Sequence, residues 1–231
     1  MPLPACRLVL FDFDGTLADS FPFFVEVLGE LARRHGFTPV TPQQIPLMRR
    51  QDVRANMRLV GLPAWKLPHV AASFMQLMQS RRAAVPLFAG VQETLAFLRE
   101  QGMTLALLTS NSAVNAVRTL GPASAAHFAY LEGGSPILGK RARIRRVLAR
   151  SGIPASQALY VGDQISDLRA AHAAGVAFAA VAWGYGEIDS LRQAGADQVF
   201  ADVGELRRLV SDLGCTSPAD CTEFSCARPR G

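Results

Sequence analysis

Cysteine, lysine and long apolar runs are all scarce in this sequence of 231 residues. Its four cysteines are too few for a small disulfide-stapled scaffold. The longest apolar stretch, residues 173–183, is shorter than the roughly 18 residues that a membrane-spanning helix needs. The first residues lack the long apolar region and the small-residue cleavage site of a secretory signal. We therefore expect a cytoplasmic protein in a reducing compartment, with no membrane partner.

Only two lysines, Lys66 and Lys140, stand among the 24 basic residues, so arginine is the general cation of this chain. The net charge of +5 suits an anionic substrate. The basic residues are spread out and are not interleaved with aromatic residues, so we expect no nucleic-acid partner. The densest arginine cluster is interpreted as the solvated face of a helix, and it comprises Arg141, Arg143, Arg145, Arg146 and Arg150.

Short apolar runs alternate with helical patterns along most of the chain. The runs at 7–13, 103–109, 158–162 and 176–183 predict strands buried on both faces, and weaker candidates lie at 128–131 and 198–201. Helical spacing of apolar residues predicts helices at 91–101, 112–120, 140–151, 166–174, 187–194 and 203–213. This alternation predicts an α/β fold with a doubly wound parallel sheet.

The alternation stops between residues 17 and 85. This stretch contains no convincing strand and predicts helices at 21–34, 51–59 and 67–84. We interpret residues 17–85 as a helical cap inserted after the first strand, and residues 1–16 and 86–213 as the core domain. The tail, residues 214–231, has little apolar pattern and is expected to be mobile.

Two aspartates follow the first predicted strand in the run FDFDGT. Side chains two apart on a strand point the same way, so Asp12 and Asp14 can face one site while Phe13 points away. Neighbouring carboxylates repel each other unless a proton or a cation lies between them, and Mg²⁺ suits such oxygens. An Asp-Gly turn without chemistry is the simpler alternative for this motif alone.

Polar residues also follow two later strands. Thr109, Ser110 and Asn111 could form an anion site at a helix start, although an ordinary helix cap explains them more simply when they are taken alone. Asp163 and Asp167 follow the strand at 158–162, where they could complete a metal site or serve only as helix-start acids.

Lys140 begins a predicted helix that is otherwise rich in arginine. Because this chain uses arginine for ordinary surface cations, a lysine here indicates a compact ammonium that reaches a phosphate. The carboxyl ends of parallel strands share one sheet edge, which is where ligands bind in open α/β sheets. The convergence of these groups on that edge is a stronger signal than any one motif.

These polar groups occur along the chain in a fixed order. In that order the sequence resembles the haloacid dehalogenase-like hydrolase superfamily, and within it the phosphoglycolate-phosphatase-like group. FDFDGTLADS is similar to its first motif, Thr109 or Ser110 to its second, Lys140 to its third, and GDQISDLRAA to its fourth. The resemblance covers about residues 7–213. It implies a Rossmann-like catalytic core, a small helical cap and a monomer or homodimer.

The resemblance implies a Mg²⁺-dependent phosphomonoester hydrolase that acts on a small phosphorylated metabolite of phosphoglycolate-like type. Asp12 would be the nucleophile and would form an aspartyl-phosphate, and Asp14 would be the general acid and base. The phosphoryl group would be held by Lys140 with Thr109, Ser110 and Asn111. Mg²⁺ would be held by Asp12, the Asp14 carbonyl and Asp163, with Asp167 in support.

Two other functions remain open at this point. A phosphomutase of the same superfamily resembles this pattern closely. A non-catalytic phosphate-binding or regulatory module would keep the fold, but four clustered acids without a metal are costly to bury. In the predicted cap, Arg50, Arg54 and Arg58 recur every four residues and could clamp a carboxylate of the substrate, although a solvated stripe explains the spacing more simply.

Overall fold

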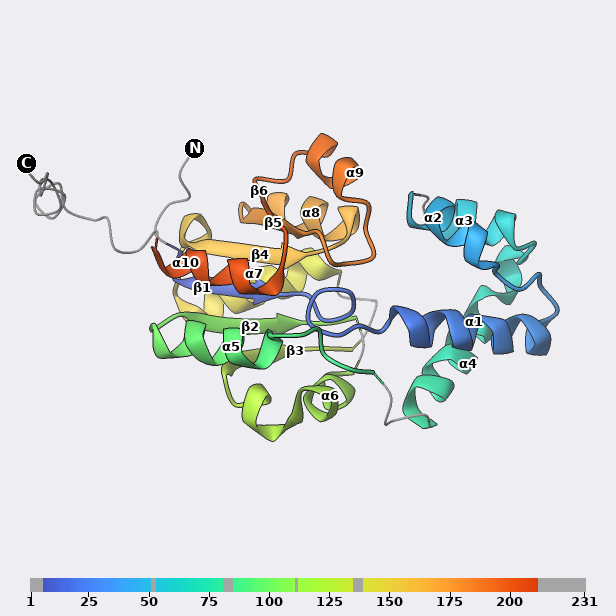
Figure 1. Ribbon diagram of the computed structural model, residues 1–231, viewed down its shortest axis with the longest axis horizontal. Coiled ribbons are helices and arrows are strands. Elements are labelled where there is room, and N and C mark those ends of the chain that lie inside the picture. The colour runs from blue at the N-terminus through green and yellow to red at the C-terminus, as the bar shows by residue number, and fades with distance from the viewer. Residues whose placement is uncertain (1–5, 51–52, 81–84, 111, 135–138, 212–231) are drawn as a thin grey trace, which may run out of the picture.

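The computed structural model describes residues 6–50, 53–80, 85–110, 112–134 and 139–211. Within these ranges six parallel strands form one sheet in the order β3-β2-β1-β4-β5-β6 (Figure 1). The strands are β1 Leu8–Phe11, β2 Thr104–Leu108, β3 Phe128–Glu132, β4 Ala158–Gly162, β5 Ala177–Val181 and β6 Gln198–Phe200. The predicted doubly wound parallel sheet is confirmed.

The two faces of the sheet are covered by different helices because successive strand residues point to opposite sides. Val9 and Phe11 pack with Leu95 and Leu98 on one face, whereas Leu10 packs in the core cluster of the other face. The first face carries α5 Val91–Glu100, α6 Ala113–Ala125 and α10 Arg208–Ser211. The second face carries α7 Lys140–Ser151, α8 Ile165–His172 and α9 Ile188–Gln193.

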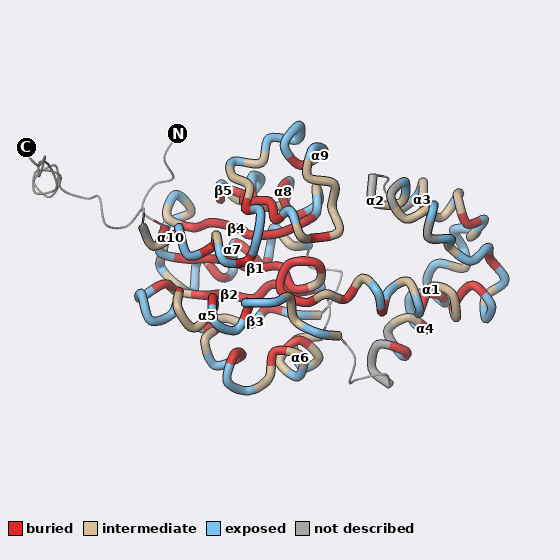
Figure 2. Tube along the Cα trace, in the orientation of Figure 1, coloured by how far each residue is buried: buried red, intermediate tan, exposed pale blue. Residues whose placement is uncertain are grey.

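Four helices lie beyond the carboxyl ends of the strands, on one side of the sheet (Figure 1). They are α1 Phe21–His35, α2 Ile45–Arg50, α3 Val53–Leu59 and α4 Leu67–Ser80, and we call them the α1–α4 segment. Short 3-10 turns, Pro42–Gln44 and Ala64–Lys66, connect them. The segment has its own small apolar cluster around Val27, Leu31 and Val70. Buried chain is concentrated in the sheet and is sparser in this segment (Figure 2).

The predicted helix at 51–59 corresponds to α3, Val53–Leu59, and residues 51–52 lie outside the described residues. The ends of the predicted helices at 67–84 and 203–213, and the predicted tail 214–231, fall partly or wholly outside the described residues. Among the helices that the structure describes, none combines the length and apolar character needed to cross a membrane.

One arginine of the cluster predicted to be solvated is buried. Arg143 is 4% exposed, and its Nη1 donates a hydrogen bond to the carbonyl of Thr109. The prediction that the whole cluster forms one solvated face is wrong at this position, because α7 turns Arg143 toward the end of β2. Arg146 and Arg150 are on the outer side, and each lies 3.0 Å from a carboxylate oxygen of Glu132.

Candidate active site

The loop after β1 is folded tightly by its own backbone. The amides of Leu17 and Ala18 donate to the carbonyl of Phe13 at 3.0 and 2.9 Å, and the Phe13 ring is buried in the core. Gly15 has φ +82°, and a Cβ there would lie 2.4 Å from Oδ2 of Asp163. A side chain at position 15 would therefore be strained and would displace Asp163.

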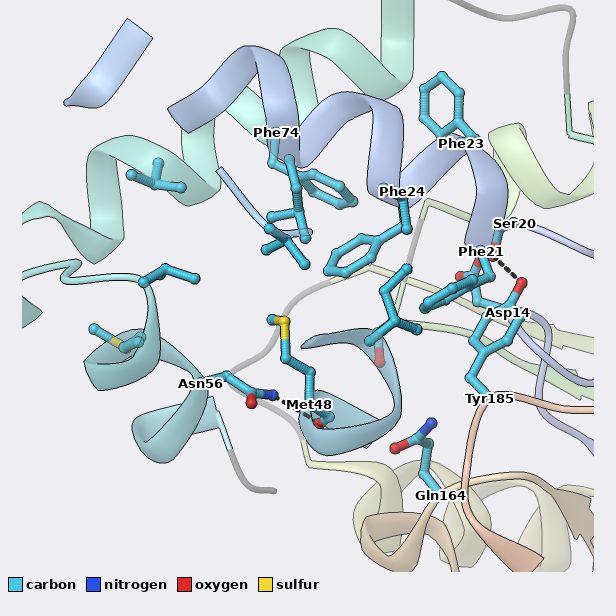
Figure 3. Close-up of a pocket in the computed structure, with 18 of the residues that line it drawn as sticks. Asp14, Ser20, Phe21, Phe23, Phe24, Met48, Asn56, Phe74, Gln164 and Tyr185 are labelled. Atoms are coloured by element: carbon cyan, nitrogen blue, oxygen red, sulfur yellow. Dashed lines mark hydrogen bonds between the residues drawn. The ribbon is translucent and has the colours of Figure 1, made fainter. Parts of the chain in front are cut away.

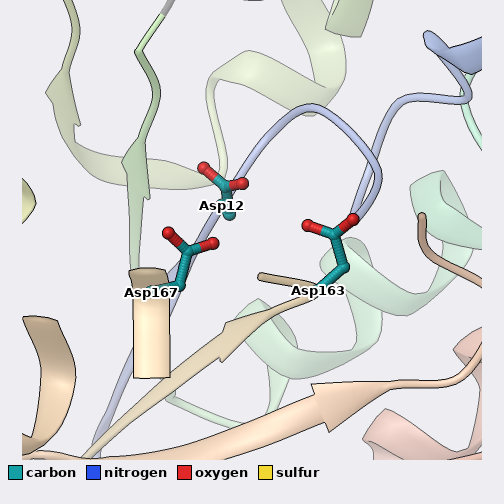
Figure 4. Close-up of side chains that lie close together, drawn as sticks. All are labelled: Asp12, Asp163 and Asp167. Carbon is teal, nitrogen blue, oxygen red and sulfur yellow. The ribbon is translucent and has the colours of Figure 1, made fainter. Parts of the chain in front are cut away.

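Three carboxylates from two neighbouring strand ends meet at this loop (Figure 4). Asp12 follows β1, Asp163 follows β4, and Asp167 lies in the first turn of α8. One oxygen of each lies within 4.8 Å of the others, and all three residues are buried. The pairing of β1 with β4 brings the two strand ends together. The structure therefore places Asp12, Asp163 and Asp167 together at one edge of the sheet, as predicted.

Lys140 lies at the start of α7 and points into this cluster. Its Nζ donates to Oδ1 of Asp12 at 3.0 Å and also donates to Oδ1 of Asp167. Burial alone lowers the pKa of the Lys140 ammonium, but the charges of Asp12 and Asp167 more than offset that effect and the pKa is raised. Lys140 therefore stays protonated between two carboxylates.

Replacing Lys140 by arginine is expected to lower kcat by about 10²-fold or more. The reason is shape: a planar guanidinium cannot take the place of one compact ammonium between Asp12 and Asp167. The matched control is Lys66→Arg, because Lys66 Nζ donates to the carbonyl of His35, at 2.7 Å, and lies over the Trp65 ring, and Lys66 does not line the cavity over the site. Steady-state kinetics of both variants checks this, and a Lys140→Arg enzyme with normal kcat would contradict the placement.

Asp163 is held by its neighbours through one oxygen only. Its Oδ2 accepts hydrogen bonds from the amides of Tyr185 at 2.8 Å and Gly186 at 3.3 Å, and from Nε2 of Gln164 at 3.0 Å. Burial, with a smaller contribution from the charge of Asp12, raises the pKa of Asp163 to about 6. Within the described residues its other oxygen, Oδ1, has no hydrogen-bond partner.

These carboxylates fit a hard divalent cation. Besides Oδ1 of Asp163, Oδ2 of Asp167 is buried without a partner among the described residues, and burial raises the pKa of Asp167 well above its usual value. With Asp12 and Lys140 included, three carboxylates and one ammonium leave a charge of −2 when all are ionised. Buried charge of one sign is costly unless it is offset, and a cation bound by oxygens is the chemistry that Mg²⁺ offers.

Asp14 is turned toward the cavity above the site, close to Ser20 and Tyr185 (Figure 3). Burial raises the pKa of Asp14 to about 6, although the Ser20 hydroxyl opposes that shift; the charge of Asp12 adds to it. The Ser20 hydroxyl also lies 3.0 Å from the hydroxyl of Tyr185. Asp14 is thus placed beside Asp12 but outside the group of three carboxylates.

The polar residues after β2 take different positions. Ser110 is exposed and lines the cavity, whereas Thr109 is buried and its amide donates to the carbonyl of Glu132 at 2.9 Å. Asn111, also predicted to bind phosphate, lies outside the described residues. The helix cap of α6 is Ser112, whose hydroxyl accepts from the amide of Asn115 at 3.2 Å. The interpretation of Ser110 as an ordinary cap is therefore wrong.

The loop after β5 was missed as part of the site. The backbone amide of Tyr185 donates a hydrogen bond to Asp163, and its side-chain hydroxyl donates to the carbonyl of Ala18 at 3.1 Å. Trp183 Nε1 donates to the carbonyl of Thr16 at 2.9 Å. Both side chains therefore anchor the loop that carries Asp12 and Asp14. The signal in the sequence was the run WGYG, residues 183–186, which begins at the end of the predicted strand at 176–183.

Comparison with known proteins assigns the family. A family model described as haloacid dehalogenase-like hydrolase matches residues 9–181. A phosphoglycolate phosphatase of Synechococcus elongatus is 32% identical over 215 residues, covering 90% of this chain and 98% of its own length. A second phosphoglycolate phosphatase, of Pseudomonas fluorescens, is 29% identical and covers 92% of this chain and 81% of its own length.

Solved structures share the fold. A haloacid dehalogenase-like hydrolase of Streptococcus pneumoniae superposes with a TM-score of 0.77 at 20% identity, covering 87% of this chain and 97% of the other. A predicted phosphoglycolate phosphatase of Haemophilus somnus gives 0.73 at 23% identity, covering 89% and 98%. The resemblance inferred from the four motifs is confirmed. The chain belongs to the haloacid dehalogenase-like hydrolase family, and the two curated relatives described above are phosphoglycolate phosphatases.

Proposed function

We propose that this protein is a Mg²⁺-dependent phosphomonoester hydrolase that acts on a small phosphorylated compound through an aspartyl-phosphate intermediate. The observation that carries the proposal is the arrangement around Asp12. Its carboxylate is in contact with Lys140, lies within 4.8 Å of the carboxylate oxygens of Asp163 and Asp167, and lines the cavity through which an ester would enter. A carboxylate at such a position is a competent nucleophile for phosphorus.

In the first step, a carboxylate oxygen of Asp12 forms a bond to phosphorus while the bond from phosphorus to the leaving oxygen breaks. Asp14 gives its proton to that leaving oxygen, so the product departs as an alcohol. Lys140 and Ser110 hold the phosphoryl oxygens in line for the attack. We further propose that the α1–α4 segment acts as a cap that keeps bulk water out during this step.

In the second step, water attacks the phosphorus of the aspartyl-phosphate and gives its proton to Asp14. The bond from phosphorus to Asp12 breaks, which frees inorganic phosphate and restores both carboxyl groups. The metal would be held by Asp12, Asp163 and the carbonyl of Asp14, with Asp167 beside them. A bound Mg²⁺ supplies the positive charge that offsets repulsion between Asp12 and the phosphate group.

The test is phosphate release from a panel of monoesters that includes 4-nitrophenyl phosphate, 2-phosphoglycolate and sugar phosphates. Hydrolysis is expected with Mg²⁺, to fall by at least about 10²-fold in excess chelator, and to return when Mg²⁺ is added back. The loss is expected because the partnerless oxygens of Asp163 and Asp167 are left without a cation.

Three results would overturn this proposal. Release of no phosphate from any ester would exclude a hydrolase. Interconversion of sugar phosphates without net release of phosphate would indicate the mutase alternative. Full activity in chelator would exclude the metal from the reaction.

A further inference from the structure

A cavity of about 730 Å³ extends from the carboxylates into the α1–α4 segment (Figure 3). At its catalytic end it is lined by Asp12, Asp14, Ser110 and Lys140. Pockets for drug-sized ligands measure about 300–1,000 Å³, so this one has room for far more than the two-carbon group of phosphoglycolate. The leaving group of a substrate bound at Asp12 would lie in the remaining space.

The far part of the cavity is lined by aromatic and aliphatic side chains. Among them are Phe21, Phe24, Met48, Met57 and Phe74. Phe21 and Phe24 lie on α1, and the Phe24 ring packs edge-on against Phe74 of α4 with centroids 5.8 Å apart. An apolar surface of this kind favours an apolar ligand, because water leaves both surfaces when they meet.

No described side chain of the α1–α4 segment brings a charge to this cavity. Among all the described lining residues the only cation is Lys140, which is already in contact with Asp12 and Asp167. Arg54 and Arg58 are exposed and do not line it, which agrees with the simpler interpretation of a solvated stripe and not with a carboxylate clamp. The side chain of Arg50 is not among those that the structure describes. The carboxylate of phosphoglycolate would therefore find no cation among the described side chains of these helices.

Among the described residues, the segment brings one side-chain amide to the cavity, and the partnerless atom of that amide is its oxygen. Asn56 uses its Nδ2 to donate to the carbonyl of Met48 at 3.0 Å. Its Oδ1 is buried without a hydrogen-bond partner among the described residues. The unused atom is thus an acceptor, which suits a hydroxyl group and repels a carboxylate.

We infer, on the basis of the proposed phosphatase function, that the preferred substrate is a phosphate monoester of a bulky apolar alcohol. This differs from the phosphoglycolate-like ester that the resemblance implies. The phosphate binds at Asp12 and Lys140, and the aliphatic or aromatic part of the alcohol occupies the space beside Phe24, Met48 and Phe74. The selectivity comes from burial of apolar surface rather than from a charged clamp.

The first test is a series of ethyl, butyl, hexyl and octyl phosphates with Mg²⁺. Their leaving alcohols are of nearly equal acidity, so differences in kcat/KM report how the chain binds. A fully buried methylene strengthens binding about fourfold. Since the chain is expected to be only partly buried, we expect kcat/KM to rise by at least about tenfold from ethyl to hexyl phosphate. Hexyl phosphate is also expected to exceed 2-phosphoglycolate. A flat series, or a preference for 2-phosphoglycolate, overturns the inference and leaves the phosphatase function intact.

A second measurement does not depend on turnover. Hexylphosphonate and 3-phosphonopropionate cannot be hydrolysed, and the latter has the shape and charge of phosphoglycolate. Calorimetry with Mg²⁺ is expected to show tighter binding of hexylphosphonate, by at least about tenfold. If hexylphosphonate bound more tightly but the protein hydrolysed no ester, the proposed phosphatase function would be refuted and the inferred apolar preference would stand. The reverse order, or equal binding, would refute the inference.

A charge-introducing variant tests the lining directly. Phe24 is 38% exposed and is not one of the buried residues of α1, so this helix can carry an arginine there while Val27 and Leu31 keep their core contacts. Phe24→Arg is expected to lower kcat/KM for hexyl phosphate by at least about tenfold and to raise it for 2-phosphoglycolate. The matched control is Leu47→Arg, which is 44% exposed in the same segment and outside the cavity lining.

The two variants are compared as the ratio of kcat/KM for hexyl phosphate to that for 2-phosphoglycolate, with circular dichroism to verify the fold. Leu47→Arg is expected to keep the wild-type ratio. A Phe24→Leu variant keeps an apolar side chain and is expected to retain the preference even if the arginine variant fails to fold. An unchanged ratio in folded Phe24→Arg, or loss of the preference in Leu47→Arg, would contradict the assignment.

Discussion

Replacing Asp12 by asparagine is expected to lower kcat by at least about 10⁴-fold, since an amide cannot form the bond to phosphorus. The asparagine has the same shape, and position 12 keeps its backbone hydrogen bond to Val161 at 2.9 Å, so the fold is expected to persist. Steady-state kinetics measures the loss, and circular dichroism measures the fold. Acid quenching of the wild-type enzyme during turnover of a labelled ester should leave label on Asp12.

The matched control for this variant is Asp19→Asn. Asp19 is an acid of the same loop that neither lines the cavity nor belongs to the group of three carboxylates. The Asp19→Asn variant is expected to change kcat by less than about threefold, because substitutions away from the reacting groups usually have small effects. A fully active Asp12→Asn enzyme would show that another group attacks phosphorus, and equal losses in both variants would show that loop folding rather than chemistry was disturbed.

Adding one methyl group at Gly186 is expected to lower the free energy of unfolding by about 3 kcal/mol and to lower activity by at least about 10²-fold. A Cβ at Gly186 would lie 1.6 Å from the carbonyl oxygen of Asp163, so backbone must move. That movement would draw the amides of Tyr185 and Gly186 away from Oδ2 of Asp163. Denaturant unfolding and Mg²⁺-dependent hydrolysis measure the two effects.

A glycine in open space provides the comparison. A Cβ at Gly29, inside α1, would meet no atom within 4 Å. Gly29→Ala is expected to raise the free energy of unfolding by about 0.5–1 kcal/mol, because alanine loses less backbone entropy in a helix. If Gly186→Ala proved as stable and as active as wild type, the close packing of the β5 loop against Asp163 would be wrong.

The central strands were predictable because they are buried on both faces. Residues of β1 and β4 are apolar at successive positions, which few other local structures require. The carboxylate site followed from them, since a parallel sheet places the ends of neighbouring strands at one edge. Asp12, Asp163 and Lys140 could therefore be assigned to one place before any distance was known.

Features that depend on contacts between distant segments were missed. Helical spacing shows Arg143 as one of several arginines, and only the end of β2 beside α7 provides the Thr109 carbonyl that it binds. The position of Tyr185 depends on how the loop after β5 meets the loop after β1, 167 residues away in the chain at Ala18. Neither relation leaves a periodic pattern in the sequence.

The sequence by itself determined the layered α/β fold and the acidic, lysine-bearing edge, because both arise from local apolar patterns and from the direction of the strands. Only the tertiary structure decided the character of the cavity. Its wall is assembled from α1 to α4, and whether a side chain such as Phe24 or Arg58 faces that space depends on how the four helices pack. Packing is a property of all the contacting surfaces together, so no single stretch of sequence specifies it.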